Sequence, residues 1–444
     1  MTQNSFEFDV VVVGGGPAGL AAACAAAEAK SRVALVDESP WLGGQIWRGH
    51  ESAKLKNNSP ATIWIERFRN SGAALLDRTA IVAAPRPGLL LAEHEQGPRQ
   101  IRWRQLILAT GARELFLPFP GWTLPGILGP GGLQALVKHG WPIEGKRVVV
   151  AGSGPLLLAV AEGLKKYGAR VLAIYEQASQ RNVLKFGLKL LSHWGKLWQA
   201  MKLRSATLGI PYRCGIWPVA AEGESQVERV TFTDGQRSWS EDCEHLACGF
   251  GMVPNVELPL ALGCELKDDF IWVDNWQATS VPNVYCAGEP TGIGGADCAL
   301  IEGQIAGYAA TGDQTKAEAL LDSRNSWHSF RSSLAAAFAL RPELKTLAKD
   351  ETLVCRCEDV SLGRIQQFNG WREAKLQSRC GMGACQGRIC GAAVKFLFGW
   401  HAESVRPPIL PARVSSLVAQ PAERTEGERK PVEPSVHAAS PPNK

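Results

Sequence analysis

The chain has 444 residues, of which 45% are hydrophobic and 20% charged, enough for two or three domains with large cores. Its net charge of +5 is small, which argues against nucleic acid as a partner. Lys165–Lys166 and the basic run 185–202 are interpreted as solvated helix faces.

The N-terminus has no basic region followed by a cleavage site, so we expect a cytoplasmic protein, with peripheral association at the inner membrane through a complex as an alternative. Residues 10–27 are uncharged and about long enough to span a membrane. They are rich in glycine and alanine and poor in large apolar residues. We therefore expect a strand, a turn and a helix there, and no transmembrane segment.

The first motif is FDVVVVGGGPAGLAAACAAAEAKSRVALVDE, residues 8–38. It predicts strand, G-x-G-x-x-G turn, helix, strand and acid. Gly14 permits the tight turn, Gly16 lets the backbone approach a pyrophosphate, and Gly19 lets the helix pack on the strand. An acid after the second strand can accept hydrogen bonds from a ribose. The predicted dinucleotide contacts here are Gly14, Gly16, Pro17, Ala18, Gly19, Asp37 and Glu38.

Three later segments add to this motif: GGQIWR (43–48), LILATGA (106–112) and TSVPNVYCAGEPTGIGGADCALIEGQIAG (279–307). With them the chain resembles the flavoproteins with two dinucleotide-binding domains, which include thioredoxin reductase-like and glutathione reductase-like enzymes. The resemblance implies an α/β fold and bound FAD. It also implies that a helix around 299–307 directs its N-terminus at the flavin ring. The further FAD contacts that it implies are Gly44, Gln45, Thr110, Gly111, Gly288 and Glu289, the last in place of the family's aspartate.

A second unit, GKRVVVAGSGPLLLAVAEGLKKYGARVLAIYE (145–176), repeats strand, turn, helix, strand and acid. Gly152 and Gly154 are its candidate nucleotide contacts. Leu157 stands at the third glycine position, where a large side chain crowds the helix against the strand. We therefore expect a weak or absent NAD(P) site, the alternative being a domain that holds another adenine nucleotide.

No dithiol relay is visible in the two nucleotide-type units. GGQIWRG contains no cysteine, and Cys214, Cys243 and Cys248 do not form a C-x-x-C pair. Electrons must then leave a flavin by another route.

Five of the twelve cysteines lie between Cys355 and Cys390, in LVCRCEDV and SRCGMGACQGRICG. In a cytoplasmic protein such a cluster favours a metal site over disulfides. The glycine-rich loop suits an iron–sulfur cluster, whose sulfides accept hydrogen bonds from backbone N–H groups. Spacing alone leaves structural zinc open.

Taken together, these units resemble the large, cofactor-bearing subunits of bacterial heteromeric amine dehydrogenases, the family of opine oxidase, D-hydroxyproline dehydrogenase and hydrogen cyanide synthase. The resemblance implies a small C-terminal 2Fe–2S domain like bacterioferritin-associated ferredoxin. Its implied ligands are Cys355, Cys357, Cys385 and Cys390, with Cys380 as a nearby buried thiol. It also implies a smaller partner flavoprotein subunit, like an amino-acid oxidase, that oxidises the amine, and possible association with a third small subunit.

The favoured hypothesis is an electron-transfer subunit that relays electrons through FAD and the cluster, with no substrate-oxidising residue of its own. The alternatives are a stand-alone NAD(P)H-dependent FAD/iron–sulfur reductase, a hydrogen cyanide synthase subunit that works on glycine, and a non-redox zinc protein. The predicted limits are 1–113 and 266–312 for the FAD-binding domain, 114–265 for the second nucleotide-type domain, 313–350 for a helical linker, 351–412 for the 2Fe–2S domain and 413–444 for a disordered tail.

Overall fold

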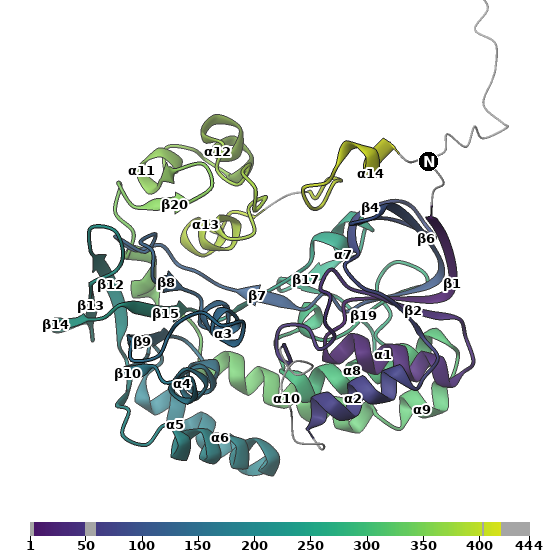
Figure 1. The fold of residues 1–444 in the computed structure, drawn as a ribbon, viewed down its shortest axis with the longest axis horizontal. Helices are drawn as coiled ribbons and strands as arrows, with labels where there is room; N and C mark the ends of the chain where they lie inside the picture. Colours follow the sequence, from purple (N-terminus) through teal and green to yellow (C-terminus); the bar gives the residue numbers. More distant parts are fainter. Residues whose placement is uncertain (1–3, 49–58, 402–403, 419–444) are drawn as a thin grey trace, which may run out of the picture.

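The structure is a computed structural model that describes residues 4–48, 59–401 and 404–418. Two α/β domains lie side by side, and a small C-terminal module lies above the second (Figure 1). All twelve cysteines are free thiols.

The first domain is built on a sheet with strand order β3-β2-β1-β6-β5-β4, in which β19 also pairs with β6. Its antiparallel part is the meander β4–β5–β6, and its other pairs are parallel. The bounds are β1 (Asn4–Val13), β2 (Val33–Val36), β3 (Ala74–Leu76), β4 (Ala80–Arg86), β5 (Leu89–His94), β6 (Gly97–Leu108) and β19 (Val284–Cys286).

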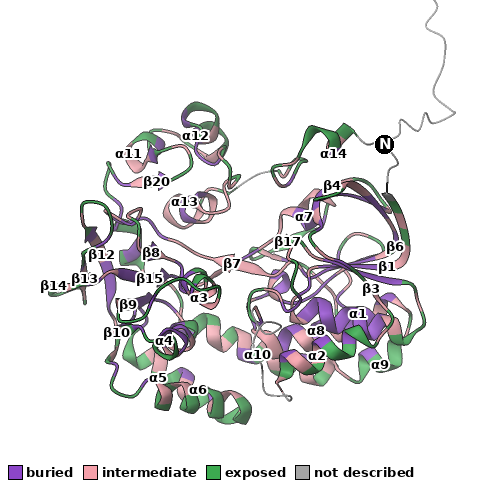
Figure 2. Ribbon diagram, viewed as in Figure 1, coloured by how far each residue is buried: buried purple, intermediate pink, exposed green. Residues whose placement is uncertain are grey.

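Three helices of this domain are α1 (Pro17–Glu28), α2 (Pro60–Arg69) and α8 (Ala296–Ala310). α1 and α8 are largely buried (Figure 2). They approach closely because two positions on α8 have no side chain. A Cβ at Gly303 would lie 2.1 Å from the Ala18 carbonyl oxygen, and one at Gly307 would lie 2.4 Å from that of Ala22.

The second domain has a parallel sheet of order β11-β10-β9-β15-β8 and an antiparallel sheet β12-β13-β14. The parallel strands bury apolar residues on both faces: α3 and α4 pack on one face, and the antiparallel sheet packs on the other. The bounds are β8 (Ile127–Leu128), α3 (Pro130–Lys138), β9 (Arg147–Gly152), α4 (Leu156–Lys166), β10 (Arg170–Glu176), α5 (Gln180–Lys189), η1 (Leu190–Ser192), α6 (Trp194–Ala206), β11 (Tyr212–Cys214), β12 (Trp217–Glu222), β13 (Arg229–Thr233), β14 (Ser238–Asp242) and β15 (His245–Gly249).

The chain leaves and re-enters the first domain through one antiparallel pair, β7 (Ala112–Glu114) with β16 (Met252–Pro254). α7 (Glu257–Ala261) follows, and then the short hairpin β17 (Leu266–Lys267) with β18 (Phe270–Ile271). Leu258 and Cys264 are buried in the core of the first domain. This packing favours ending the second domain near Gly251 instead of at 265, while the other limits stay predictions.

The predicted linker, 313–350, contains the helices α9 (Gln314–Glu318), α10 (Leu321–Ala337) and η3 (Pro342–Thr346), which follow α8. A short helix, η2 (Glu289–Thr291), precedes α8. α10 lies between the helices of the two domains (Figure 1). On one side it contacts α8, and on the other it contacts α5.

The C-terminal module contains β20 (Leu353–Cys355), β21 (Val360–Ser361), α11 (Leu362–Ile365), α12 (Trp371–Ser378) and α13 (Cys390–Phe398). The segment after it is ordered as far as α14 (Val414–Val418), where Ser416 Oγ donates a 2.9 Å hydrogen bond to Glu93. The disorder expected from 413 is therefore wrong for 413–418, and 419–444 lie outside the described residues. Within the described part of the chain, no helix is both long and apolar enough to cross a membrane.

Candidate nucleotide and metal sites

The predicted FAD contacts meet because four parallel strands end together. In register, Val13 of β1 pairs with Val36 of β2 and with Leu108 of β6, and Leu108 pairs with Cys286 of β19. The glycine turn, Asp37, Thr110 and Gly288 therefore begin at one edge of the sheet. In open α/β sheets this carboxyl edge is where ligands bind.

The first glycine turn has the geometry that its sequence predicts. Gly14 has a φ of +110°, and a Cβ at Gly19 would lie 1.7 Å from the Gly14 carbonyl oxygen. Gly16 precedes α1, whose first residue is Pro17. At Gly16 a Cβ would meet nothing nearer than the Gly44 Cα atom at 4.0 Å. The space in front of Gly16 is thus open at the N-terminus of α1, where a pyrophosphate binds favourably.

Asp37 is held against this turn. Its carboxylate accepts hydrogen bonds from the backbone N–H groups of Gly15 and, at 2.7 Å, Ser39. Burial raises the pKa of Asp37, because its effect is larger than that of the two hydrogen bonds, which lower the pKa. Glu38 and Gln45 are exposed, and their roles stay predictions.

Thr110 and Gly111 contact the returning chain. Thr110 Oγ1 donates to the Asn255 carbonyl oxygen at 2.7 Å, and Asn255 Nδ2 donates to the Thr110 carbonyl oxygen at 2.8 Å. The Asn255 backbone N–H donates to the Gly111 carbonyl oxygen. This edge of the site is therefore fixed by the crossover between the domains.

Glu289 is a half-buried acid beside the carboxyl edge. Its Oε1 accepts a 3.0 Å hydrogen bond from the Gly295 N–H, and its buried Oε2 has no partner. Burial raises the pKa of Glu289 to about 7. A buried carboxylate oxygen without a donor is costly, and hydroxyl groups of a flavin side chain would satisfy it. The described residues thus fit FAD, which Glu289 and the Gly16 turn would hold.

A second buried acid behind this loop was not predicted. Glu302 accepts from Gly288 N–H at 2.8 Å and Thr291 Oγ1 at 2.9 Å, and His328 Nε2 lies 2.8 Å from its other oxygen. Burial alone would raise its pKa, but the hydrogen bond from His328 and the nearby Arg331 outweigh burial, so the pKa of Glu302 is lowered. The sequence signal that could have identified Glu302 is a glutamate within an alanine- and glycine-rich helix. Glu302 anchors the Gly288–Glu289 turn to α10.

The second glycine turn joins a strand to a helix as the first does, but Gly154 has a positive φ where Gly16 has a φ of −77°, and α4 begins one residue later than α1 relative to the glycines. Gly152 and Gly154 have φ values of +133° and +102°. Glu176, at the end of β10, accepts a 2.7 Å hydrogen bond from the Gly154 N–H and a 2.8 Å one from the Ala178 N–H. Leu157 is fully buried in the core between α4 and the sheet. The leucine is thus accommodated by packing.

The edge of this second turn is bonded to residues 338–341, which we name the linker strap. Ser153 Oγ donates to the Phe338 carbonyl oxygen at 3.1 Å. Gln177 Nε2 donates to the Ala339 carbonyl oxygen at 3.2 Å, and its Oε1 accepts from the Arg341 N–H at 3.2 Å. The polar groups that border the turn and the acid are therefore already paired within the chain.

The five C-terminal cysteines lie in one module. The sulfurs of Cys355, Cys380 and Cys390 lie within 4.8 Å of one another and are buried. Cys357, which is exposed, lies beside the half-buried Cys385, whose N–H donates to its sulfur. Hydrogen bonds from the Cys380 and Cys390 thiols lower the pKa of Cys355 to about 2. Cys380 is as close to Cys355 as a ligand would be, so the predicted ligand set stays a prediction.

Glycines let the cysteine loop close. A Cβ at Gly383 would lie 2.3 Å from the Cys357 Cβ, and one at Gly381 would lie 2.7 Å from the Trp371 ring. The N–H groups of Gly381 and Glu358 donate to the Cys355 sulfur. Such N–H···S hydrogen bonds are typical of iron–sulfur sites, so the donor set fits a cluster.

One arginine joins this loop to the first domain. Arg113 Nε donates to the Arg388 carbonyl oxygen at 3.0 Å, and its Nη1 donates to Asn255 Oδ1 at 2.7 Å. Glu257 forms an ion pair with Arg113, with 3.0 Å between Glu257 Oε1 and Arg113 Nη2. Because Asn255 also contacts Thr110, a short chain of contacts runs from the FAD edge to the cysteine loop.

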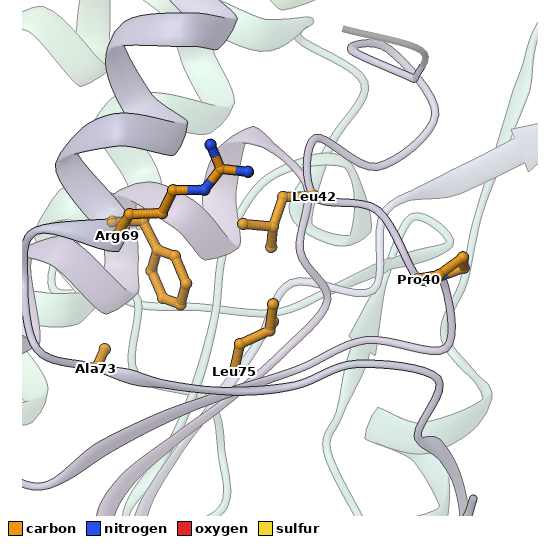
Figure 3. A pocket seen from close by; sticks show the side chains of 6 residues that line it. Pro40, Leu42, Arg69, Ala73 and Leu75 are labelled. Atoms are coloured by element: carbon orange, nitrogen blue, oxygen red, sulfur yellow. The ribbon is translucent and has the colours of Figure 1, made fainter. Parts of the chain in front are cut away.

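A separate cavity of about 390 Å³ lies at the outer edge of the first sheet (Figure 3). None of its lining residues is a predicted FAD contact, so we do not assign the cofactor to it. It is lined by Pro40, Leu42, Phe68, Arg69, Ala73 and Leu75.

Comparison with known proteins agrees with this geometry. Residues 8–303 match the family model of pyridine nucleotide-disulphide oxidoreductases. The A subunit of opine oxidase from Rhizobium meliloti is 32% identical, over 92% of this chain and 98% of the relative. Hydrogen cyanide synthase subunit HcnB of Pseudomonas protegens is 31% identical, over 86% of this chain and 89% of the relative.

Solved structures share the fold. L-proline dehydrogenase from P. horikoshii has a TM-score of 0.69 at 20% identity, covering 94% of this chain and 80% of that one. Thioredoxin reductase of T. acidophilum has a TM-score of 0.54 at 23% identity, covering 70% of this chain and 99% of that one. The chain belongs to the pyridine nucleotide-disulphide oxidoreductase family and, within it, to the flavoprotein subunits related to hydrogen cyanide synthase subunit HcnB and to the A subunit of opine oxidase.

Proposed function

We propose that this flavin dehydrogenase subunit is the electron-transfer component of a heteromeric enzyme that oxidises an amino acid or an opine, of the D-hydroxyproline or opine type. The observation that carries the proposal is the Thr110–Asn255–Arg113–Arg388 series of contacts. It ties the cysteine loop to the edge where the FAD contacts converge, so two redox centres would lie on one rigid path.

Bound flavin accepts electrons in pairs, whereas a 2Fe–2S cluster accepts them singly. Oxidation of an amine carbon to an imine on the partner flavoprotein subunit releases two electrons and two protons. The electrons pass through this chain to an external one-electron acceptor, and the protons go to solvent. Arg113 holds the cysteine loop in place, and Glu289 and the Gly16 turn hold the flavin.

The test compares the purified chain alone with the chain co-purified with its partner. The chain alone should give no amine-dependent dye reduction, and the complex should. Arg113→Gln should slow dye reduction by the complex while FAD and iron contents stay normal, and exposed Arg364→Gln is the matched control. Amine-dependent activity of the chain alone would contradict the proposal.

The ligand set is tested separately. Cys357→Ser, Cys385→Ser or Cys390→Ser should remove or strongly perturb the cluster signal in electron paramagnetic resonance of the reduced protein, because each loses a thiolate ligand. Cys380→Ser should keep the signal. The reverse pattern for Cys380 and Cys390 would make Cys380 the ligand.

A glycine-oxidising, cyanide-forming complex is the second candidate, because the identities to the two kinds of relative are nearly equal at 32% and 31%. Cyanide release from glycine by the complex would favour this candidate, and turnover of D-hydroxyproline or an opine would favour the first.

A further inference from the structure

The helices α5 and α6, joined by η1, lie at the rim of the second domain (Figure 1), and six large apolar residues of this segment are exposed. Their exposed fractions range from 51% for Leu191 to 73% for Trp194. We call this surface the α5–α6 face. It consists of Leu184, Leu188, Leu191, Trp194, Trp198 and Met201.

The exposed residues follow helical spacing. Leu184, Leu188 and Leu191 recur at i, i+4 and i+7, and so do the two tryptophans and Met201 in α6. Residues with this spacing lie on one side of a helix. The opposite side of α5 already has its partners, since Phe186 packs on Phe330 of α10 with ring centroids 5.7 Å apart. The exposed stripe is therefore additional to the side that the protein core uses.

The charged residues of α5 and α6 themselves are all cationic. Residues 177–221 contain no aspartate or glutamate. Lys196 pairs with Asp297 at 2.7 Å. Five other cations of α5 and α6 are exposed: Arg181, Lys185, Lys189, Lys202 and Arg204.

We propose that the α5–α6 face seats the protein on an anionic lipid bilayer. Tryptophan and leucine flanked by lysine and arginine are the composition of helices that lie in the membrane interface. Lysine is depleted at protein–protein interfaces, whereas each lysine or arginine near an anionic membrane surface adds to binding. This replaces the interpretation of 185–202 as a merely solvated face. The contact is peripheral.

The test uses the full chain, loaded with FAD, and sedimentation with phosphatidylcholine vesicles that contain or lack phosphatidylglycerol. We expect binding that needs phosphatidylglycerol and weakens as salt rises, because screening reduces the attraction. No binding to phosphatidylglycerol vesicles at low salt would overturn the proposal.

Two variants locate the contact. Lys185→Glu with Lys189→Glu should weaken binding by about twentyfold or more, whereas the same charge change at Arg364 and Arg372 should have little effect. Trp194→Ser with Trp198→Ser should weaken it by at least about tenfold, and Trp272→Ser, at another exposed tryptophan, is the control. FAD content and circular dichroism check that each variant folds.

Vesicle binding that survives both variants would overturn the proposal. A second contradicting result has two parts: the unmodified chain does not bind vesicles, and the tryptophan variant no longer co-purifies with the partner subunit. The face would then be a protein interface.

Discussion

The two glycine turns, 14–19 and 152–157, share the order strand, turn and helix, and differ in backbone conformation and surroundings, since Gly16 has a φ of −77° and Gly154 one of +102°. In each, an acid at the end of the next strand accepts an N–H from the turn: Asp37 from Gly15 and Glu176 from Gly154. In front of the first turn lies open space, and the nearby Glu289 has an unpaired buried oxygen. The second turn is bonded to the linker strap.

We infer that the glycines set the backbone conformation of such a turn, and that more distant residues decide whether a nucleotide binds there. Leu157, the local departure from the motif, is absorbed into the core. The strap bonds to Ser153 and Gln177 at the edge of the second turn, while a Cβ at Gly154 would meet nothing within 4 Å. We therefore expect a substitution in the first turn to reduce FAD binding more than a substitution in the second turn.

The largest effect is expected at Gly16. In Gly16→Val the Cβ itself has room, but the added methyl groups occupy the pyrophosphate space at the helix N-terminus. The protein should fold and lose its FAD, as measured by flavin absorbance per chain. Gly154→Ala in the second turn should keep its flavin. Normal flavin content in Gly16→Val would show that the cofactor is held elsewhere.

The next effect is at Glu289. In Glu289→Gln the charged acceptor for a flavin hydroxyl is lost, and such a bond contributes about 1.5–3 kcal/mol. FAD affinity of the apoprotein should fall by about tenfold to a hundredfold, as measured by fluorescence titration. Glu176→Gln is the matched change in the other domain and should leave this affinity unchanged; an equal loss in both would refute the distinction.

A smaller effect concerns pH. Burial raises the pKa of Glu176 to about 7 from 4.5. Stability from this group is fully present below pH 4.5 and is lost as pH rises through about 7, at most about 3 kcal/mol. Glu176→Gln should remove this loss, narrowing by a few degrees the difference between the melting temperatures at pH 5 and pH 8. If the difference between the two melting temperatures is the same in Glu176→Gln, another group causes the loss of stability with rising pH.

The smallest effect is expected from nicotinamide nucleotides. With its edge bonded to the strap, the second turn should not bind NADH or NADPH at micromolar concentration, so neither should bleach the flavin anaerobically. Dithionite, which needs no binding site, is the positive control. Rapid bleaching by NADPH would instead favour the stand-alone reductase.

Local sequence patterns were enough to predict much of the fold. The glycine spacing and the acid after the second strand sufficed to predict both turns, because these positions interact within one strand–helix–strand unit. The cysteine spacing likewise predicted a compact module. The strap could not be predicted, since Ser153 and Phe338 are 185 positions apart in the chain. The same holds for the contact between Glu302 and His328 of α10, because neither residue belongs to a motif.

One helix has a mechanical consequence. On α10, His328 bonds to Glu302 of the first domain, while Phe330 and Trp327 pack on Phe186 and His193 of the second. The side chains that brace the two domains are thus neighbours on one rigid rod. We therefore expect the two domains to unfold as a single cooperative unit. Flavin bound to the first domain should then raise the melting temperature of the second as well, although no atom of the cofactor would touch the second domain.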